Sequence, residues 1–466
     1  MKSQFSCGKT SVVLCSLALG SSLFVKNAAA EKILAHDGDW TVYSDGRVGA
    51  FASYVRGDGS PNSRSDPSAS QGSQITPYGG GLSADASQTW PPGQPAPTVS
   101  ETTAGTTTQE TPQAKVERLR FRSGMIANTF GFGVRGPLTE HTTIKGYIQI
   151  WAWVENLGED KTQFNTADVR QGYVKLEGGW GSLLAGRSRG LFARGNTDTD
   201  VQYAHGYGVG YAGAVDSQGP TQGQIGFGVL GSGFCSGVVY GTPVFHGLQL
   251  NIGAFDPVKL NGAWTRTKWA RPEAELTFES PTIAGIGKVI VFVNGVYEKL
   301  YRPNMPDSAS VAAKGLAYGL RAEVGWFRLG LGGHYGQGLG LNYALEPSQA
   351  AVSQANSLRW IDGYSVQPMV VLGKLDVFAG WGITRVFPSA DDLIPFAIHT
   401  LDPNASDSAN QRYNVIKYQQ GISAGAIYHV RPWLHIDLDL FRADFAWFLG
   451  DKQVDYFVNS GMMFTW

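Results

Sequence analysis

The sequence predicts an all-β protein, a 16-stranded antiparallel transmembrane β-barrel with long extracellular loops and short periplasmic turns. Three observations carry this prediction: a signal peptide, period-two alternation in many segments, and no long apolar run after residue 30. Without about eighteen consecutive apolar residues, a chain cannot cross a bilayer as helices. A closed ring of strands is the other arrangement that satisfies every backbone hydrogen bond in lipid.

The N-terminus has the pattern of a secretory signal. Lys2 and Lys9 precede an apolar run over 11–25, and small residues before position 31 favour cleavage after Ala30. We expect residues 1–30 to be a signal peptide and residues 31–466 to form a single outer-membrane barrel.

Charge and cysteine content restrict the possible partners and chemistry. The chain carries 37 Lys and Arg against 38 Asp and Glu, and cleavage removes three of the lysines, which leaves 34 against 38. This mildly acidic balance argues against nucleic acid as a partner. Cys235 is the one cysteine left after cleavage, so it has no partner for an intramolecular disulfide, and we expect a small buried residue.

Sixteen segments alternate with period two between turn signals, and the even number suits a bacterial single-chain barrel. They lie at 39–57, 117–136, 142–155, 168–178, 181–188, 233–242, 248–256, 268–280, 288–301, 313–325, 327–340, 357–372, 375–386, 411–430, 434–448 and 453–466.

The last segment alternates most regularly and ends on an aromatic residue. One face is mostly apolar and should contact lipid; it consists of Val454, Tyr456, Val458, Ser460, Met462, Phe464 and Trp466. The opposite face should contact water; it consists of Asp455, Phe457, Asn459, Gly461, Met463 and Thr465. We expect this strand to close the barrel against residues 39–57.

The connections alternate between short and long. Short turns belong on the periplasmic rim and long loops outside the cell. The first long loop, 58–116, is rich in Ser, Pro, Gly and Thr, and we expect a solvated surface insertion. The third is 188–232.

Three motifs resemble the Gram-negative general (diffusion) porin family. They are DWTVYSDGRVGAF at 39–51, FGVRGPL at 132–138 with IKGYIQ at 144–149, and RQGYVKLEGGWGSLLAGR at 170–187. The resemblance implies a homotrimer in the cell outer membrane, in contact with lipid and lipopolysaccharide. Each barrel would allow passive diffusion of small hydrophilic solutes and ions, with loop 3 folded into the lumen as a constriction and no cofactor. Phe464 and Trp466 resemble the family's C-terminal assembly signal.

The same resemblance assigns the basic wall of the constriction. Arg170 and Arg187 match wall arginines of the family, and Arg47 occupies a lumen-facing position on the first strand. Two positions depart from the pattern, since Gly131 stands in place of the second-strand arginine and Leu184 in place of a polar residue.

The third loop supplies the other side of the constriction. Its charged residues include Arg189, Arg194, Asp198 and Asp200. The two aspartates are either the acids of the constriction or ordinary solvated or turn-capping residues.

Aromatic residues on the third strand leave two interpretations open. Trp151 and Trp153 share the face assigned to the lumen, where they could stack sugar rings in a carbohydrate-selective channel. A one-residue bulge would instead turn both outward into the interfacial aromatic girdle.

The arginines of the second strand leave a similar choice. By the register of Phe130 and Phe132, we expect Arg118, Arg120 and Arg122 to face outward, towards lipopolysaccharide phosphates or a neighbouring subunit. A bulge in that strand would place them at the mouth instead.

Nothing in the sequence predicts an enzyme. His435 and Asp437 share one strand face, which is weak support for catalysis, and eight scattered histidines suggest no metal site. A plugged structural or adhesive barrel remains the alternative to a channel.

Overall fold

The structure of the protein is a computed structural model. The structure describes residues 31–58, 115–122, 128–152, 167–202, 224–258, 266–281, 287–302, 305–307, 310–345, 358–388, 416–448, 450 and 452–466. Residues 1–30 and most of 58–116 lie outside these ranges, so the predicted signal peptide and first loop stay predictions. No helix among the described residues is long and apolar enough to cross a membrane.

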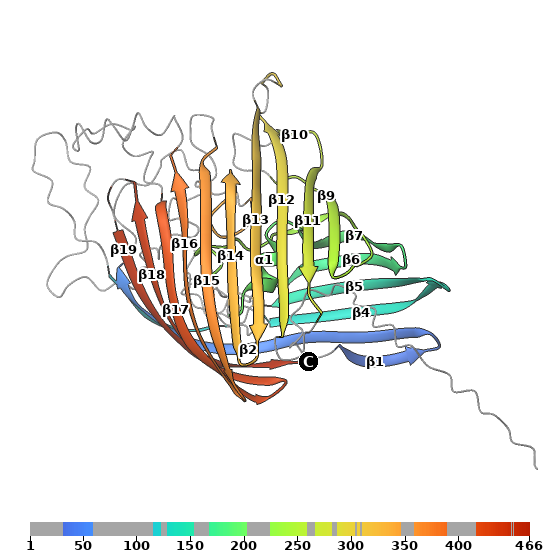
Figure 1. The fold of residues 1–466 in the computed structure, drawn as a ribbon, viewed down its shortest axis with the longest axis horizontal. Coiled ribbons are helices and arrows are strands. Elements are labelled where there is room, and N and C mark those ends of the chain that lie inside the picture. Colours follow the sequence, from blue (N-terminus) through green and yellow to red (C-terminus); the bar gives the residue numbers. More distant parts are fainter. Residues whose placement is uncertain are drawn as a thin grey trace, which may run out of the picture.

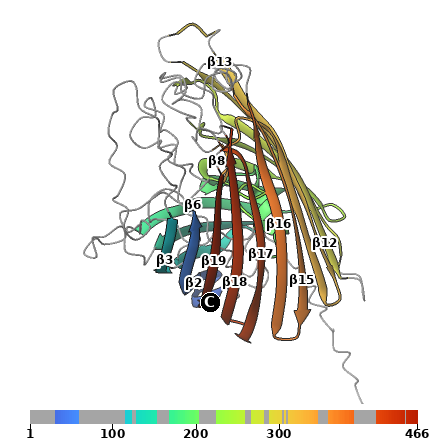
Figure 2. The same ribbon diagram turned by 90° about the vertical axis from the view of Figure 1, so that its left-hand side faces the viewer.

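The strands form a closed antiparallel ring with sixteen positions, as the sequence predicts (Figures 1 and 2). The first half consists of β2 (Trp40–Asp58), β3 (Lys115–Arg122) with β4 (Asn128–Thr139), β5 (Thr142–Ala152), β6 (Ala167–Gly178), β7 (Gly181–Arg189), β8 (Phe234–Gly241), β9 (Leu248–Phe255), and β10 (Arg266–Thr267) with β11 (Arg271–Glu279). The second half consists of β12 (Lys288–Tyr301), β13 (Ser310–Val324), β14 (Phe327–Gln337), β15 (Trp360–Leu372), β16 (Leu375–Phe387), β17 (Ile416–Arg431), β18 (Leu434–Trp447) and β19 (Lys452–Thr465).

Alternation along the strands separates an apolar outer surface from a polar interior. On β19, Met462 is 58% exposed, whereas Asn459 on the opposite face is 2% exposed. The exposed outer row of β18 is Ile436, Leu438 and Leu440, and His435, Asp437 and Asp439 point inward. Successive side chains of a strand point to opposite faces, so these strands have one face for lipid and one for the lumen.

The ring closes where the last strand pairs with the first. The backbones of Trp466 and Gly46 exchange two hydrogen bonds of 2.9 and 3.0 Å. The Trp466 ring lies against Phe130 and Phe464, and its Nε1 donates to Ser44 Oγ at 3.2 Å. Closure of 453–466 against 39–57 is therefore confirmed.

An extra strand, which the sequence did not predict, precedes the ring. β1 (Lys32–Asp37) folds back on the start of β2 through a turn in which Gly38 has a φ of 58°. It pairs with β2 residues 40–44, just beyond the point where β19 ends. This hairpin occupies a position that the last strand is too short to fill.

The second strand is split, and the two halves are out of phase. From the pair Arg47–Thr129 to the pair Phe51–Arg122 there are four residue steps along β2. Along the second strand, from β4 back to β3, there are seven. This odd difference reverses which residues face the lumen. Arg118, Arg120 and Arg122 therefore pair with the inward row Val55, Ser53 and Phe51. The expectation that their register is outward is wrong, and the bulge alternative applies.

Apolar side chains pack inside one half of the ring. Phe192 and Leu230, from the segment after β7, pack against Phe292 of β12 and against Leu339 and Leu345, which follow β14. A second cluster joins Phe227 and Leu341 to inward aromatics of β18 and β19. The interior beside β11–β19 is thus packed like a protein core.

Candidate functional site

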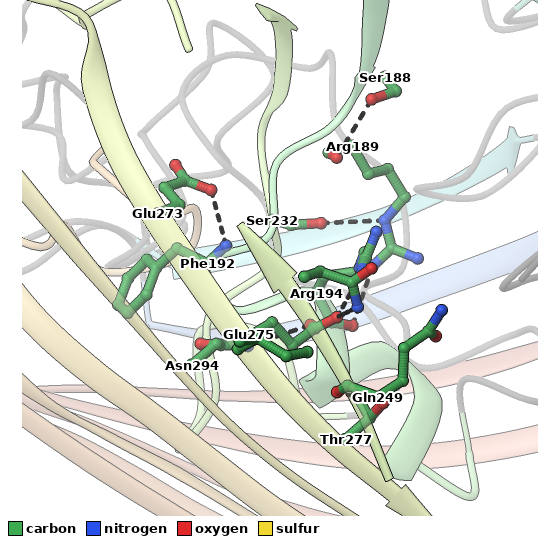
Figure 3. Close-up of polar contacts among 12 residues, drawn as sticks. Ser188, Arg189, Phe192, Arg194, Ser232, Gln249, Glu273, Glu275, Thr277 and Asn294 are labelled. Atoms are coloured by element: carbon green, nitrogen blue, oxygen red, sulfur yellow. Dashed lines mark hydrogen bonds and ion pairs between the residues drawn. The ribbon is translucent and has the colours of Figure 1, made fainter. Parts of the chain in front are cut away.

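A segment from Gly190 to Gln202 follows β7 and lies against the inner face of the opposite strands (Figure 3). The amide of Phe192 donates to Glu273 Oε2 at 2.8 Å, and the amide of Ala193 donates to Asn294 Oδ1 at 3.0 Å. Both acceptors are buried inward residues of β11 and β12. Side chains of the wall thus satisfy backbone donors that the segment would otherwise bury without partners.

Two arginines of the third loop hold this segment in shape. Arg189 donates through Nε to Ser232 Oγ at 2.9 Å, and through its guanidinium to Thr197 Oγ1 and the Arg194 carbonyl. Arg194 forms an ion pair with Glu275, whose side chain is 1% exposed. These contacts position α1 (Arg194–Thr199), which packs against β12, β13 and β14. Both arginines therefore serve first as anchors.

The two aspartates of the segment differ in their surroundings. Burial raises the pKa of Asp198 to about 7, against the opposing effect of Arg189. Asp200 Oδ2 instead accepts a hydrogen bond of 3.1 Å from the amide of Gln224, which joins the two described parts of the loop. The charge of Asp198 therefore changes near pH 7, whereas Asp200 holds the two described parts of the loop together.

The returning part of the loop reaches the far strands. Gln202 and Gln224 each donate to Ser423 Oγ of β17, at 2.8 and 3.0 Å. The amide of Gly228 donates to Thr384 Oγ1 of β16 at 2.9 Å. The described parts of the loop therefore lie along β11–β18, on the side opposite β4–β6.

The predicted wall arginines occupy different positions. Arg47 lies on the inward row of β2 between Asp45 and Gly49. Arg170 lies at the irregularity where β6 slips against β5, forms an ion pair with Asp168 at 2.8 Å, and is 29% exposed. Arg187 pairs with Gly172 in the outward row, and its Nε donates to the Arg170 carbonyl at 3.2 Å. The contribution of Arg187 to the lumen wall stays a prediction.

Trp151 faces inward but is 8% exposed. The edge of Phe234 packs on it at 5.3 Å between ring centroids, and the Arg170 guanidinium lies over its ring at 5.1 Å. Its Nε1 donates to Gln149 Oε1 at 2.8 Å. Protein groups therefore already cover the ring that a sugar would need. Trp153 lies outside the described residues.

A polar network on β2, β4 and β5 was not foreseen. The Tyr147 hydroxyl donates to Asp45 Oδ1 at 2.8 Å, and Lys145 Nζ lies 5.4 Å from the centroid of the Tyr147 ring. Glu31 forms ion pairs with Arg135 and Lys145, at 2.5 and 3.5 Å. Every second residue of the segment from position 145 onward is polar or aromatic, and this alternation was the signal available in the sequence.

Two further groups of the packed half were also missed. Arg271 forms an ion pair with Glu273 at 2.8 Å and donates to Cys235 Sγ at 2.9 Å, so this cysteine is not merely an apolar filler. The segment after β14 returns inward, where the amide of Gly231 donates to the Asn342 carbonyl at 2.8 Å. Within the described ranges, no group of three His, Cys, Asp or Glu residues is placed to hold a metal ion.

Solved structures share this architecture at low sequence identity. The outer membrane channel DcaP of Acinetobacter baumannii matches with a TM-score of 0.59 and 13% identity, over 93% of this chain and 100% of that chain. The anion-selective porin from Comamonas acidovorans matches with a TM-score of 0.54 and 11% identity, over 92% of this chain and 100% of that chain. Salmonella typhi OmpF in complex with daunomycin matches with a TM-score of 0.50 and 12% identity, over 94% of this chain and 100% of that chain.

No protein-family model matches the sequence, and no curated protein matches it. The sixteen-position ring, its apolar outer surface and the likeness to these structures agree on the architecture. The chain therefore has the fold of the Gram-negative outer-membrane porins.

Proposed function

We propose that the protein is an outer-membrane porin, a water-filled channel through which small hydrophilic solutes and ions diffuse passively. The uneven lining of the lumen carries this proposal. The loop segment covers β11–β14, where Glu275 is 1% exposed, whereas Asp168 on β6 is 43% exposed. Charged side chains that keep contact with water, opposite a segment that narrows the lumen, are what a selective aqueous path requires.

The mechanism needs no energy coupling, because solutes move down their own gradients. Size is selected by the distance between the 190–202 segment and the facing wall. Charge is selected by Arg47 and Arg170 on the wall and by Asp198 on the segment. This arrangement supports the constriction assigned to loop 3, residues 188–232.

Planar-bilayer recording of the purified protein tests the proposal. We expect steps of ohmic current whose size rises with salt concentration. A correctly folded protein that inserts into the bilayer but carries no ohmic current would refute the channel.

A plugged structural or adhesive barrel is the second candidate, and the apolar clusters inside β11–β19 favour it. Such a barrel would exclude small sugars from its lumen. Swelling of proteoliposomes in arabinose distinguishes the two, since a channel predicts swelling and a plug predicts none.

Carbohydrate selectivity has less support, because the Trp151 ring is already covered. It would require Phe234 and Arg170 to move aside. Block of single-channel current by maltooligosaccharides measures this, and Trp151→Ala should abolish any block if the ring binds sugar.

The homotrimer, the lipid and lipopolysaccharide contacts, and the assembly role of Phe464 and Trp466 are proposals that rest on the sequence resemblance. The exposed apolar surface and the contacts of Trp466 with β2 support them. Deletion of Trp466 should lower the amount of assembled barrel in outer membranes more than the conductance of the molecules that do assemble.

A further inference from the structure

Three polar side chains on the inner face of β18 and β19 have no visible role in the fold. Asp437, Asp439 and Asn459 are 4%, 1% and 2% exposed. The carboxylate oxygens of Asp439 and both amide atoms of Asn459 form no hydrogen bond within the described part of the chain, and no described side chain donates to the Asp437 carboxylate. No described basic side chain forms an ion pair with either carboxylate.

The strand register brings these groups together. Asn459 lies directly opposite Asp439 on one side and opposite the inward Ser53 of β2 on the other. Asp437 is two residues from Asp439 on the same face. Directly opposed side chains have Cβ atoms about 4.5–5.5 Å apart, so four oxygen-bearing side chains share one small area of the lumen wall.

The surroundings of this area are apolar. The inward rings of Phe51, Phe378, Phe441 and Phe457 are each at most 5% exposed, and they lie on β2, β16, β18 and β19. Gly425 lies directly opposite Asp439, where a Cβ atom would be 2.7 Å from Asp439 Oδ1. The absence of a side chain at this position leaves room for the carboxylate.

The neighbouring charged groups do not neutralise the two aspartates. Asp376 is occupied by His429, at 3.0 Å, and by Arg328, at 3.7 Å. The register positions of Arg120 and Arg122 lie on β3, three strand spacings from β18, which is about 14 Å. Burial of an unpaired carboxylate is strongly unfavourable, and two adjacent ones also repel each other.

We propose that Asp437, Asp439 and Asn459, with Ser53, bind a hard cation on the lumen wall. Carboxylate, amide and hydroxyl oxygens are the ligands that Ca²⁺ and similar ions prefer, and the inward His435, two residues before Asp437, already contacts the Pro432 carbonyl at 3.1 Å. The cation would supply the positive charge that the surrounding phenylalanines cannot. The end of the 190–202 segment lies nearby, because Val201 packs in the same apolar cluster as Phe51 and Phe378, but cation binding does not depend on conduction.

Equilibrium dialysis of the purified full-length mature protein in detergent tests the proposal, with Ca²⁺, Mg²⁺ and K⁺ as separate probes. We expect saturable binding of at least one of them, weakened about tenfold or more in the Asp437→Asn/Asp439→Asn variant. Asp444→Asn is the matched control, because Asp444 lies on the same strand and is paired with Arg442 at 2.9 Å. Its binding should equal that of the unchanged protein.

Asn459→Ala keeps both carboxylates and provides a second test if the double variant does not fold. It should bind the same cation more weakly, with folding checked by heat-modifiable migration on a gel. Equal binding in the Asp437→Asn/Asp439→Asn variant, or no binding of any of the three cations by the unchanged protein, would overturn the proposal. Because dialysis does not require ion flow, either result is independent of whether the barrel conducts.

Discussion

The two halves of the lumen differ in what lies against the wall. Along β11–β19, loop segments cover the wall and bury Phe192, Phe227 and Leu339 in apolar clusters. Along β2–β6, Arg170 and Asp168 keep partial contact with water. The same period-two pattern produced both halves, so the difference arises from what the loops bring against the wall. One half is packed as a core, and the other is the surface that a solute would meet in the proposed channel.

The largest expected effect comes from removal of a buried charge in the packed half. Glu275→Gln leaves the Arg194 guanidinium without its carboxylate partner, which should lower the free energy of unfolding by about 3–5 kcal/mol. Urea unfolding in detergent, followed by circular dichroism, measures the loss. Glu279→Gln on the same strand is the control, because its pair with Lys288 is exposed and should contribute less than about 1 kcal/mol. Equal losses would show that burial of the Glu275–Arg194 pair contributes nothing beyond an exposed pair.

A somewhat smaller effect should follow from a cavity in the same half. Phe227 is fully buried, and its ring packs on Phe441 at 4.9 Å between centroids. Phe227→Ala should lower the free energy of unfolding by about 3 kcal/mol and increase the current noise as the loop loosens. Phe132→Ala, on the lipid face, should leave the noise unchanged. Unchanged noise in both variants would argue that the loop is held by its polar anchors alone.

Substitution on the open wall should change selectivity rather than stability. Arg170→Ala removes a positive charge from the solute path, so the reversal potential in asymmetric KCl should shift towards cation preference. Arg442→Ala removes one positive charge from the outer face of β18 and should leave the reversal potential unchanged. A shift of the same size in both variants would mean that net charge, and not the wall, sets selectivity.

The smallest effect concerns pH. Because burial raises the pKa of Asp198 from 3.8 to about 7, its contribution to stability is fully present below pH 4 and is lost as pH rises through 7. The conductance should change over the same range, with a midpoint near pH 7, and Asp198→Asn should remove this change. Asp307→Asn is the control, since the hydrogen bond from Lys268 lowers the pKa of Asp307 and keeps it charged throughout. A midpoint that persists in Asp198→Asn would assign the titration to another group.

Strand positions could be predicted from the sequence because alternation is a local property. The segment predicted at 288–301 is identical to β12 (Lys288–Tyr301), and all sixteen segments correspond to ring positions. The phase of the second strand could not be predicted, since it depends on three additional residues in a connection without a periodic pattern.

The candidate site was predictable in its charges but not in its contacts. Arg189 and Arg194 were placed in the constriction loop, yet their partners depend on how that loop packs across the lumen. Arg271, Glu273 and Glu275 alternate on one face of their strand, and such a row of charges facing inward was a signal that a loop would anchor there. The inward segment around Leu339 and Leu345 has no periodicity, so only tertiary packing defines it.

The split second strand has a consequence for how this barrel tolerates change. The inward and outward rows alternate in opposite phase in its two halves, β3 and β4. A single residue added to or removed from the connection between Arg122 and Asn128 would therefore exchange the faces of β3 relative to β4. Two residues added together would restore the original faces. The register of β3 relative to β4 thus depends on the length of one connection, without substitution of any residue in either strand.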